Sequence, residues 1–545
     1  MNCDLTLTYR TEEGIRTLTG PGETEDLILA VADPGHRRVT VTARRPVTLI
    51  SYEETGHDFW KKGTGSPKNT RYFLNGYQSW TDTREFLGGE TERDVTRLPK
   101  KLVDTFSFDR YGDALFFPYS KDILHGYDLF YAEGAVNGFV ASLNLTEAYL
   151  IARVEKATGR ISLQSDVKGA ALQPGETFTV CDYLYAGGKE EGMAAFRAHF
   201  PEREIQKIFG YTSWYNYYQN VSEEILLRDL AGLDDRFNLF QIDDGYETFV
   251  GDWLEVDPVK FPRGLAPLVE QIHGRGYMAG IWLAPLAAEE KSRVFREHPD
   301  WIRKDGSGAP VKCGFNWSGF YALDMDNPEA REYIRRCLHH YVDMGFDFFK
   351  LDFLYAANLP LYGGKTRCRA ASEAYAFLRE CLGDKLILGC GATLANGAGI
   401  FDYMRIGPDV SLKFDDAFYM RFMHRERIST KVTLQNTVYR SFLNRRFFGN
   451  DPDVFLLRDD NLSLTKEQRR ALITLNALFG SVLMTSDNLG AYDEEKRRLL
   501  DGALQLFQKT AVTGYARQGR EIRITYTLEG EERSIRYDTK KGVLL

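Results

Sequence analysis

The strongest constraint on the fold is an alternation of short apolar runs with amphipathic helical segments, which begins near Gly210. We expect each run to form a buried strand that ends in polar residues. Eight runs fit: YTSWY (211–215), LFQIDD (239–244), MAGIWLAP (278–285), FDFFKLDF (346–353), LILGCG (386–391), YMRIGPD (403–409), a weaker RRFFGNDPD (445–453) and SVLMTSDN (481–488). Eight β/α repeats are typical of a closed (β/α)8 barrel. A doubly wound sheet gives a similar pattern, but eight repeats favour closure.

The segments on either side of these repeats have a different pattern. Residues 1–205 contain short alternating runs such as RRVTVTARRPVTLISY, separated by Gly, Pro and Asn turns, and almost no helical periodicity. This pattern predicts a β-sandwich. The last segment, REIRITYTLEGEERSIRYDT, also alternates. We therefore predict three domains: a β-sandwich (1–205), a (β/α)8 barrel (206–508) and a small C-terminal β-strand domain (509–545).

Composition and charge exclude several classes of function. The 545 residues are 43% hydrophobic and 27% charged, which suits a large core, and the formal net charge of -8 argues against nucleic-acid binding. No apolar run is long enough to span a membrane, and the N-terminus MNCDLTLTYRTEEG has no apolar export signal. The 7 cysteines are scattered without a C-x-x-C pair. We expect a reduced, cytoplasmic, metal-free protein with no nucleic-acid or membrane partner.

Polar residues collect at the ends of the predicted barrel strands, where active sites of this fold form. Lys350 and Asp352 stand inside an apolar run and face the same way, because strand side chains alternate. Buried charges need a partner or a ligand, so a structural ion pair is the alternative to a substrate contact. For Asp243 and Asp244 the alternative is a turn or a helix cap. The full set is Asp243, Asp244, Trp282, Lys350, Asp352, Cys390, Arg405 and Asp409.

Two carboxylates from different strands suit glycoside hydrolysis. One attacks or activates water, and the other holds a proton for the leaving oxygen. Lys350 would keep Asp352 ionised by Coulomb attraction, as a nucleophile requires. Asp409 follows Gly407 and Pro408, and a partly apolar setting there would raise its pKa.

Two other motifs compete for a cofactor or metal interpretation. LGCGATLANGAG (388–399), with Asp409 18 residues beyond Gly391, imitates a dinucleotide fingerprint, but its third glycine is misplaced and the segment is too short for a proper helix. LDMDNPEAREYI begins like a calcium loop but lacks the required Gly and the terminal Glu. Asp326 or Asn327 as a helix cap with Pro328 at the first helical position explains it better. We expect no cofactor and no metal.

The assembled motifs identify a resemblance to glycoside hydrolase family 36, the melibiase-type α-galactosidases, and especially to their compact bacterial branch. It covers essentially the whole chain and rests on FQIDDGYE, GDWL (251–254), GIWLAP, HPDW (298–301), FFKLDFLYA, ILGCG, MRIGPD and NDPD (450–453). The resemblance implies an N-terminal β-supersandwich, a (β/α)8 barrel and a C-terminal β domain.

The resemblance also implies roles for the site residues. Asp352 matches the family's nucleophile and Asp409 its acid/base, while Asp243 and Asp244 match the acceptors for galactose O4 and O6. The remaining matches line or flank the sugar: Lys350, Cys390 and Arg405 near its 2-, 3- and 4-hydroxyls, Trp282 under the ring, Tyr215 beside the pocket, and Trp80, which the N-terminal domain lends to the barrel mouth. The chain departs from the family pattern at Tyr77, Tyr211, Thr212 and Asn216. These departures put the preferred aglycone in doubt.

The predicted function is a retaining, exo-acting α-galactosidase that acts on small oligosaccharides such as melibiose or raffinose. An α-N-acetylgalactosaminidase, which needs room beside C2 near Cys390, and a galactosyl-transferring transglycosidase are the alternatives on the same scaffold. A non-catalytic sugar-binding protein is a different class, and the presence of both Asp352 and Asp409 argues against it. The only partner predicted is a sugar substrate, and the oligomeric state stays open.

Overall fold

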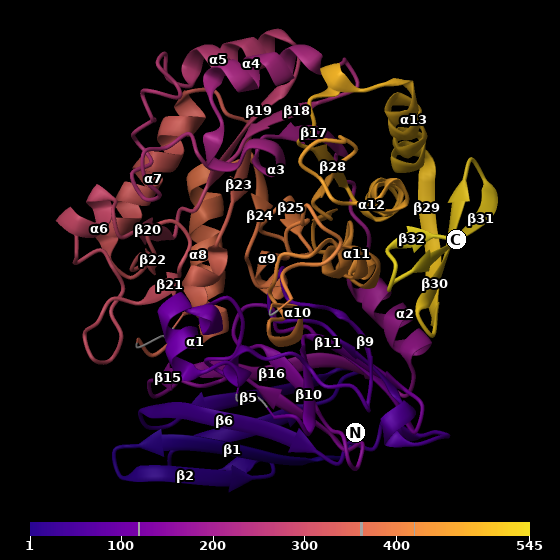
Figure 1. Cartoon of the computed structure of the whole chain (residues 1–545). Coiled ribbons are helices and arrows are strands. Elements are labelled where there is room, and N and C mark those ends of the chain that lie inside the picture. The colour runs from indigo at the N-terminus through magenta and orange to yellow at the C-terminus, as the bar shows by residue number, and fades with distance from the viewer. Residues whose placement is uncertain (118–119, 360–362, 419) are drawn as a thin grey trace.

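The computed structural model describes residues 1–117, 120–359, 363–418 and 420–545. The N-terminal strands form a layered body beneath a central body of strands and helices, and the last strands stand beside helices α12 (Lys466–Phe479) and α13 (Glu494–Lys509) (Figure 1). The predicted combination of a β-sandwich, a (β/α)8 barrel and a small C-terminal sheet is confirmed. Among the described residues, no helix has both the length and the apolar composition needed to cross a bilayer.

The N-terminal sandwich consists, in the described part of the chain, of a seven-stranded and a nine-stranded sheet. Alternating side chains such as Leu5, Leu7 and Tyr9 point into the core between them, because strand side chains alternate between faces. The first sheet contains β1 (Asp4–Thr11), β2 (Gly14–Thr19), β6 (Val47–Thr55), β10 (Ile123–Tyr127), β13 (Leu150–Glu155), β14 (Ile161–Ser165) and β15 (Ala171–Leu172). The second contains β3 (Gly22–Glu23), β4 (Leu27–Ala32), β5 (Arg37–Ala43), β7 (Lys61–Lys62), β8 (Arg71–Leu74), β9 (Arg84–Leu87), β11 (Leu129–Glu133), β12 (Val136–Ser142) and β16 (Thr177–Ala186).

This region is less purely β than its sequence indicates, because it also contains α1 (Lys100–Phe106) and α2 (Lys189–His199). Helix α2 packs directly on the second sheet, where a Cβ at Gly192 would lie 2.1 Å from the Phe139 ring. Phe196 on the same helix face is buried. The helix is missed in the sequence because its buried face is formed by one glycine and one phenylalanine rather than by a repeated apolar stripe.

The barrel strands correspond one by one to the eight predicted runs. All neighbouring strands pair in parallel, and the order of strands begins with β26 and ends with β27. These two short pieces belong to one run, so the sheet closes on itself through its seventh strand. The strands are β17 (Ile208–Thr212), β18 (Leu239–Ile242), β19 (Met278–Leu283), β23 (Phe348–Leu351), β24 (Leu386–Gly389), β25 (Tyr403–Arg405), β26 (Gly449–Asp451) with β27 (Val454–Phe455), and β28 (Val482–Thr485).

Helices follow the strands in the order that the repeats predict. Asn327 caps the long helix α7, where its side chain accepts the N–H groups of Glu329 and Ala330, as the sequence predicts. The glycine-rich segment after β24 forms only the short α9, which fits the rejection of a dinucleotide fold. The helices are α3 (Trp214–Tyr217), α4 (Glu223–Gly232), α5 (Ala266–Gly274), α6 (Arg293–Glu297), α7 (Pro328–Asp343), α8 (Arg367–Leu382), α9 (Leu394–Gly397), α10 (Met420–Met423), α11 (Thr430–Tyr439), α12 and α13.

Two small antiparallel sheets complete the fold. One is inserted after β19 and contains β20 (Ala287–Glu289), β21 (Lys312–Gly314) and β22 (Phe320–Ala322). The other forms the C-terminal domain from β29 (Thr510–Gln518), β30 (Glu521–Leu528), β31 (Glu531–Asp538) and β32 (Val543–Leu544). The inserted sheet matters for the site, because the turn between β21 and β22 reaches the barrel mouth.

Candidate active site

A cavity of about 340 Å³ opens at the carboxyl ends of the barrel strands. It is lined by polar side chains and by aromatic and apolar side chains that come from several separate segments of the chain. The lining residues are Trp80, Phe108, Tyr111, Trp214, Tyr218, Gln219, Asp243, Asp244, Trp282, Phe315, Asn316, Trp317, Lys350, Asp352, Phe353, Pro408, Asp409, Met420, His424, Glu426, Arg427 and Ile428. Two larger hollows, of about 540 and 430 Å³, lie elsewhere and contain none of the predicted site residues.

The structure brings all ten predicted site residues to this end of the barrel, in two layers. Seven of them line the cavity: Trp80, Asp243, Asp244, Trp282, Lys350, Asp352 and Asp409. Tyr215, Cys390 and Arg405 are not among the lining residues and lie buried behind the cavity wall. Arg405 is nevertheless connected to the cavity, because it donates a hydrogen bond to Asp409, which lines it. Burial raises the pKa of the Cys390 thiol well above its usual range.

Asp352 stands directly after strand β23 with two N–H donors on its carboxylate. Trp282 Nε1 donates to Oδ2 at 3.1 Å, and the peptide N–H of Phe353 donates to Oδ1 at 2.8 Å. Phe353 has a φ of 53°, in the left-handed region that non-glycine residues rarely occupy. The strained turn aims the carboxylate into the cavity, and the two donors fix its orientation.

Lys350 pairs with Asp243 and not with its sequence neighbour Asp352. Its Nζ lies 2.8 Å from Asp243 Oδ2, and both side chains are almost fully buried. Although burial alone lowers the pKa of a lysine, the charges of Asp243 and then Asp352 raise that of Lys350. The hydrogen bond of Lys350 goes to Asp243, and its interaction with Asp352 is one of charge; the expected effect of this charge on Asp352 stays a prediction.

Asp409 is the one carboxyl of the predicted catalytic pair whose surroundings favour the protonated form. Burial raises its pKa and the charge of Asp352 adds to the effect, while Arg405 and Lys350 oppose it. The net direction is upward, as predicted from the Gly-Pro sequence before it. Its side chain is still 30% exposed, so a substrate oxygen in the cavity can reach it.

Asp244 belongs to a cluster that sequence reasoning did not find. Trp317 Nε1, from the inserted sheet, donates to its Oδ2 at 3.0 Å, and Gln219 approaches its Oδ1 at 3.5 Å. Burial raises the pKa of Asp244, and burial together with the charge of Asp244 raises that of Glu247 well above its usual range. The only sequence signal for Trp317 is its place between two glycines in GFNWSG, which indicates a turn but not where the turn leads.

Trp80 enters the barrel mouth from the N-terminal sandwich. The peptide N–H of Ser79 donates to Ala392 O at 2.9 Å, which fixes this loop to the end of strand β24. The indole ring packs edge-on against Phe353, with ring centroids 5.3 Å apart. The Trp80 side chain lines the cavity, and within the described residues its buried Nε1 has no hydrogen-bond partner.

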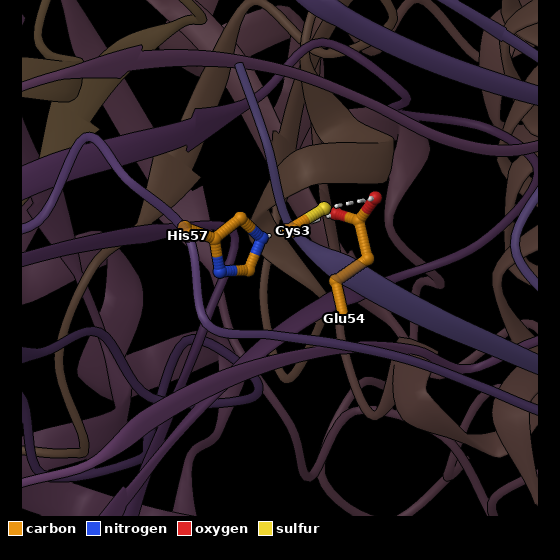
Figure 2. A group of neighbouring side chains, drawn as sticks. All are labelled: Cys3, Glu54 and His57. Carbon is orange, nitrogen blue, oxygen red and sulfur yellow. Dashed lines mark hydrogen bonds and ion pairs between the residues drawn. The ribbon is translucent and has the colours of Figure 1, made fainter.

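One group of side chains in the N-terminal sandwich has the composition of a metal site. Ligand atoms of Cys3, Glu54 and His57 lie within 4.8 Å of one another (Figure 2). However, Arg37 Nη2 lies 2.8 Å from Glu54 Oε1 and 3.1 Å from Cys3 Sγ. The Arg37 guanidinium therefore already provides the positive charge that a metal ion would bring to this group. Burial raises the pKa of the Cys3 thiol to about 12, which opposes formation of the thiolate that metals bind. We interpret the group as a buried ion-pair network.

A (β/α)8 barrel whose strands β23 and β25, on either side of β24, each carry a carboxylate into one cavity, beneath an aromatic side chain from a β-sandwich, is typical of a multidomain glycoside hydrolase. Comparison with known proteins agrees. A sequence model of the melibiase family matches residues 213–379. The α-galactosidase TtGalA from Thermus thermophilus, solved with p-nitrophenyl α-D-galactopyranoside, superposes with a TM-score of 0.71 at 27% identity, over 93% of this chain and 96% of that one. By both comparisons the chain is similar to the melibiase-type α-galactosidases.

Other relatives are more distant or align over a shorter part. AgaA, a family 36 α-galactosidase from Geobacillus stearothermophilus, shares the fold with a TM-score of 0.59 at 12% identity, over 97% of this chain and 80% of that one. The bifunctional α-galactosidase/sucrose kinase AgaSK of Mediterraneibacter gnavus is 26% identical over 270 residues, which is 44% of this chain. The alignments with the first three curated relatives span 14%, 27% and 31% of their lengths.

Proposed function

We propose that this protein is a retaining α-galactosidase that removes terminal α-galactosyl residues from small galactosides such as melibiose and raffinose. The observation that carries the proposal is the contrast between two carboxyl groups in one cavity. Asp352 receives two N–H donors, whereas burial raises the pKa of Asp409. Two carboxyl groups whose environments differ in this way suit a nucleophile and a proton donor.

The proposed reaction proceeds in two displacements. Asp352 attacks the anomeric carbon while Asp409 gives its proton to the leaving oxygen, which produces a covalent galactosyl-enzyme. Asp409 then takes a proton from water, and the resulting attack at the same carbon restores the α configuration. Trp282 holds Asp352 in place through its indole N–H group.

Recognition of galactose is assigned to the remaining cavity residues. Asp243 already accepts donors from Thr212, Gln241 and Lys350 on its Oδ2 atom, so only Oδ1 has capacity left for the sugar. Asp244 lies beside it and is oriented by Trp317. We propose that these two carboxylates read O4 and O6, and that Trp80 closes the cavity over the sugar. Tyr215, Cys390 and Arg405 support the wall behind it. In this proposal the domains keep the boundaries 1–205, 206–508 and 509–545.

The test is the relative rate on nitrophenyl α-galactoside and nitrophenyl α-N-acetylgalactosaminide, together with the anomer released first. We expect turnover of the galactoside and first appearance of α-galactose by proton NMR. First appearance of β-galactose would refute the retaining mechanism. A higher rate on the acetylated sugar would favour the α-N-acetylgalactosaminidase alternative, and galactose transfer to added melibiose at the expense of hydrolysis would favour the transglycosidase. Galactose binding without turnover would indicate a sugar-binding protein.

A further inference from the structure

Arg405 is held by three carboxylates at once. Its Nη1 donates to Asp409 Oδ1 at 2.9 Å and its Nε to Asp451 Oδ2 at 2.9 Å, while its Nη2 lies 2.9 Å from Asp453 Oδ1. Arg405, Asp451 and Asp453 are almost fully buried. One cation cannot neutralise three carboxylates of which two are almost fully buried, so the cluster favours retention of a proton on one of them.

Asp453 also contacts the backbone next to Asp409. Its Oδ2 accepts the peptide N–H of Val410, the residue that follows Asp409, at 2.7 Å. A single carboxylate therefore holds both the guanidinium that donates to Asp409 and the peptide next to it. Asp451 differs in this respect, because its Oδ1 accepts the N–H of Asp453 at 2.9 Å and makes no contact of this kind with residue 410.

The backbone of Asp453 is strained. Its φ of 74° lies in the left-handed region, and it interrupts the seventh barrel strand between β26 and β27. A strained backbone and a buried charge at the same position are costly, and such combinations concentrate at functional sites. No apolar packing is gained by an aspartate at this place.

We propose that Asp453 is a positioning residue for acid catalysis: it clamps Arg405 and the peptide of Val410 around Asp409, and it draws part of the guanidinium charge away from Asp409. The inference rests on the proposed function of Asp409 as acid/base. Asp409 then keeps the proton that the leaving oxygen requires, and its side chain is held in one orientation.

The charges around the cluster are consistent with this role. Burial raises the pKa of Asp453 to about 7, and the charges of Asp409 and Asp451 add to the effect while Arg405 opposes it. Lys350 on strand β23 and Asp352 directly after it act on Asp409 through their charges, and the Tyr215 hydroxyl contacts the cluster from α3. If the carboxylate of Asp453 is removed, Arg405 acts more strongly on Asp409 and lowers its pKa. The basic limb of the pH profile should then move to lower pH, because Asp409 loses its proton earlier.

The experiment compares Asp453→Asn with the matched control Asp451→Asn. Asparagine has the size of aspartate and tolerates the left-handed region, so the backbone of residue 453 can be kept. Both variants remove one negative charge from Arg405 and leave an amide NH2 facing a former donor, but only Asp453→Asn disturbs the hydrogen bond from the N–H of Val410; Asp451→Asn disturbs the one from the N–H of Asp453 instead. The substrates are methyl α-galactoside, whose leaving group needs protonation, and dinitrophenyl α-galactoside, whose leaving group does not.

Both variants should shift the basic limb of kcat/KM to lower pH. Only Asp453→Asn should lose roughly 100-fold on methyl α-galactoside, the order expected for a misplaced catalytic group, and several-fold less on the dinitrophenyl substrate. Equal losses in the two variants, or an unshifted basic limb in both, would overturn the inference. If Asp453→Asn does not fold, Asp453→Gly suits the same φ, and equal losses on the two substrates would overturn it there. Wild-type protein that cleaves neither galactoside would instead overturn the proposed function.

Discussion

Replacement of Lys350 by methionine tests the buried ion pair that organises the polar half of the cavity. Lys350 and Asp243 are 4% and 1% exposed, and their charged atoms are 2.8 Å apart. Removal of one partner from a buried pair costs about 3–5 kcal/mol, because the other charge stays buried without compensation. We expect the lower value, about 3 kcal/mol, since Thr212, Gln241 and the N–H of Asp244 still donate to the remaining carboxylate.

The assay is thermal unfolding of the purified variants at pH 7. In a domain of this size about 1 kcal/mol corresponds to roughly 2 °C, so the midpoint of Lys350→Met should fall by about 6 °C. The double variant Lys350→Met/Asp243→Asn should recover at least half of this loss. Lys466 provides a matched control, because it pairs with Glu495 at the same 2.8 Å but both side chains are more than 60% exposed. Lys466→Met should therefore leave the midpoint almost unchanged. A decrease of less than about 2 °C in the midpoint of Lys350→Met, or a double variant less stable than the single one, would refute the reasoning.

Three further predictions concern the catalytic pair and the aromatic lid. Asp352→Gly should lower the hydrolysis rate on the order of 10⁶-fold, and added azide should restore turnover as β-galactosyl azide; an α-azide product would contradict the nucleophile assignment. Asp409→Ala should impair glycosylation far more with melibiose than with an activated aryl galactoside, and equal losses would indicate a structural role. Trp80→Ala should weaken galactose inhibition and lower kcat/KM by about 1–3 kcal/mol with little change in the thermal midpoint, since its indole lines the cavity. A destabilised protein with normal galactose inhibition would instead mean that Trp80 only packs between the domains.

Periodicity along the chain was sufficient to predict the barrel and its strands. The run FDFFKLDF shows why: apolar side chains on both faces require both faces to be covered, one by the barrel interior and the other by the outer helices, and this requirement is visible in local order alone. Local signals also predicted the Asn327 cap of α7 and the short, glycine-rich segment after β24. The positions of Asp352 and Asp409 at strand ends followed from the same pattern, because the fold fixes where strand ends meet.

Contacts between distant segments could not be predicted in this way. The sequence places Lys350 two residues from Asp352, but closure of the barrel gives it Asp243, 107 residues away, as its partner. Trp317 reaches Asp244 only because an inserted sheet folds over the barrel mouth, and the left-handed backbone of Asp453 has no signal in the residues around it. Local sequence determines which segments become strands and helices through short-range sterics and the spacing of apolar residues. The choice of partner for a buried charge depends on which side chains the closed barrel brings within hydrogen-bond distance, and only the tertiary structure decided that.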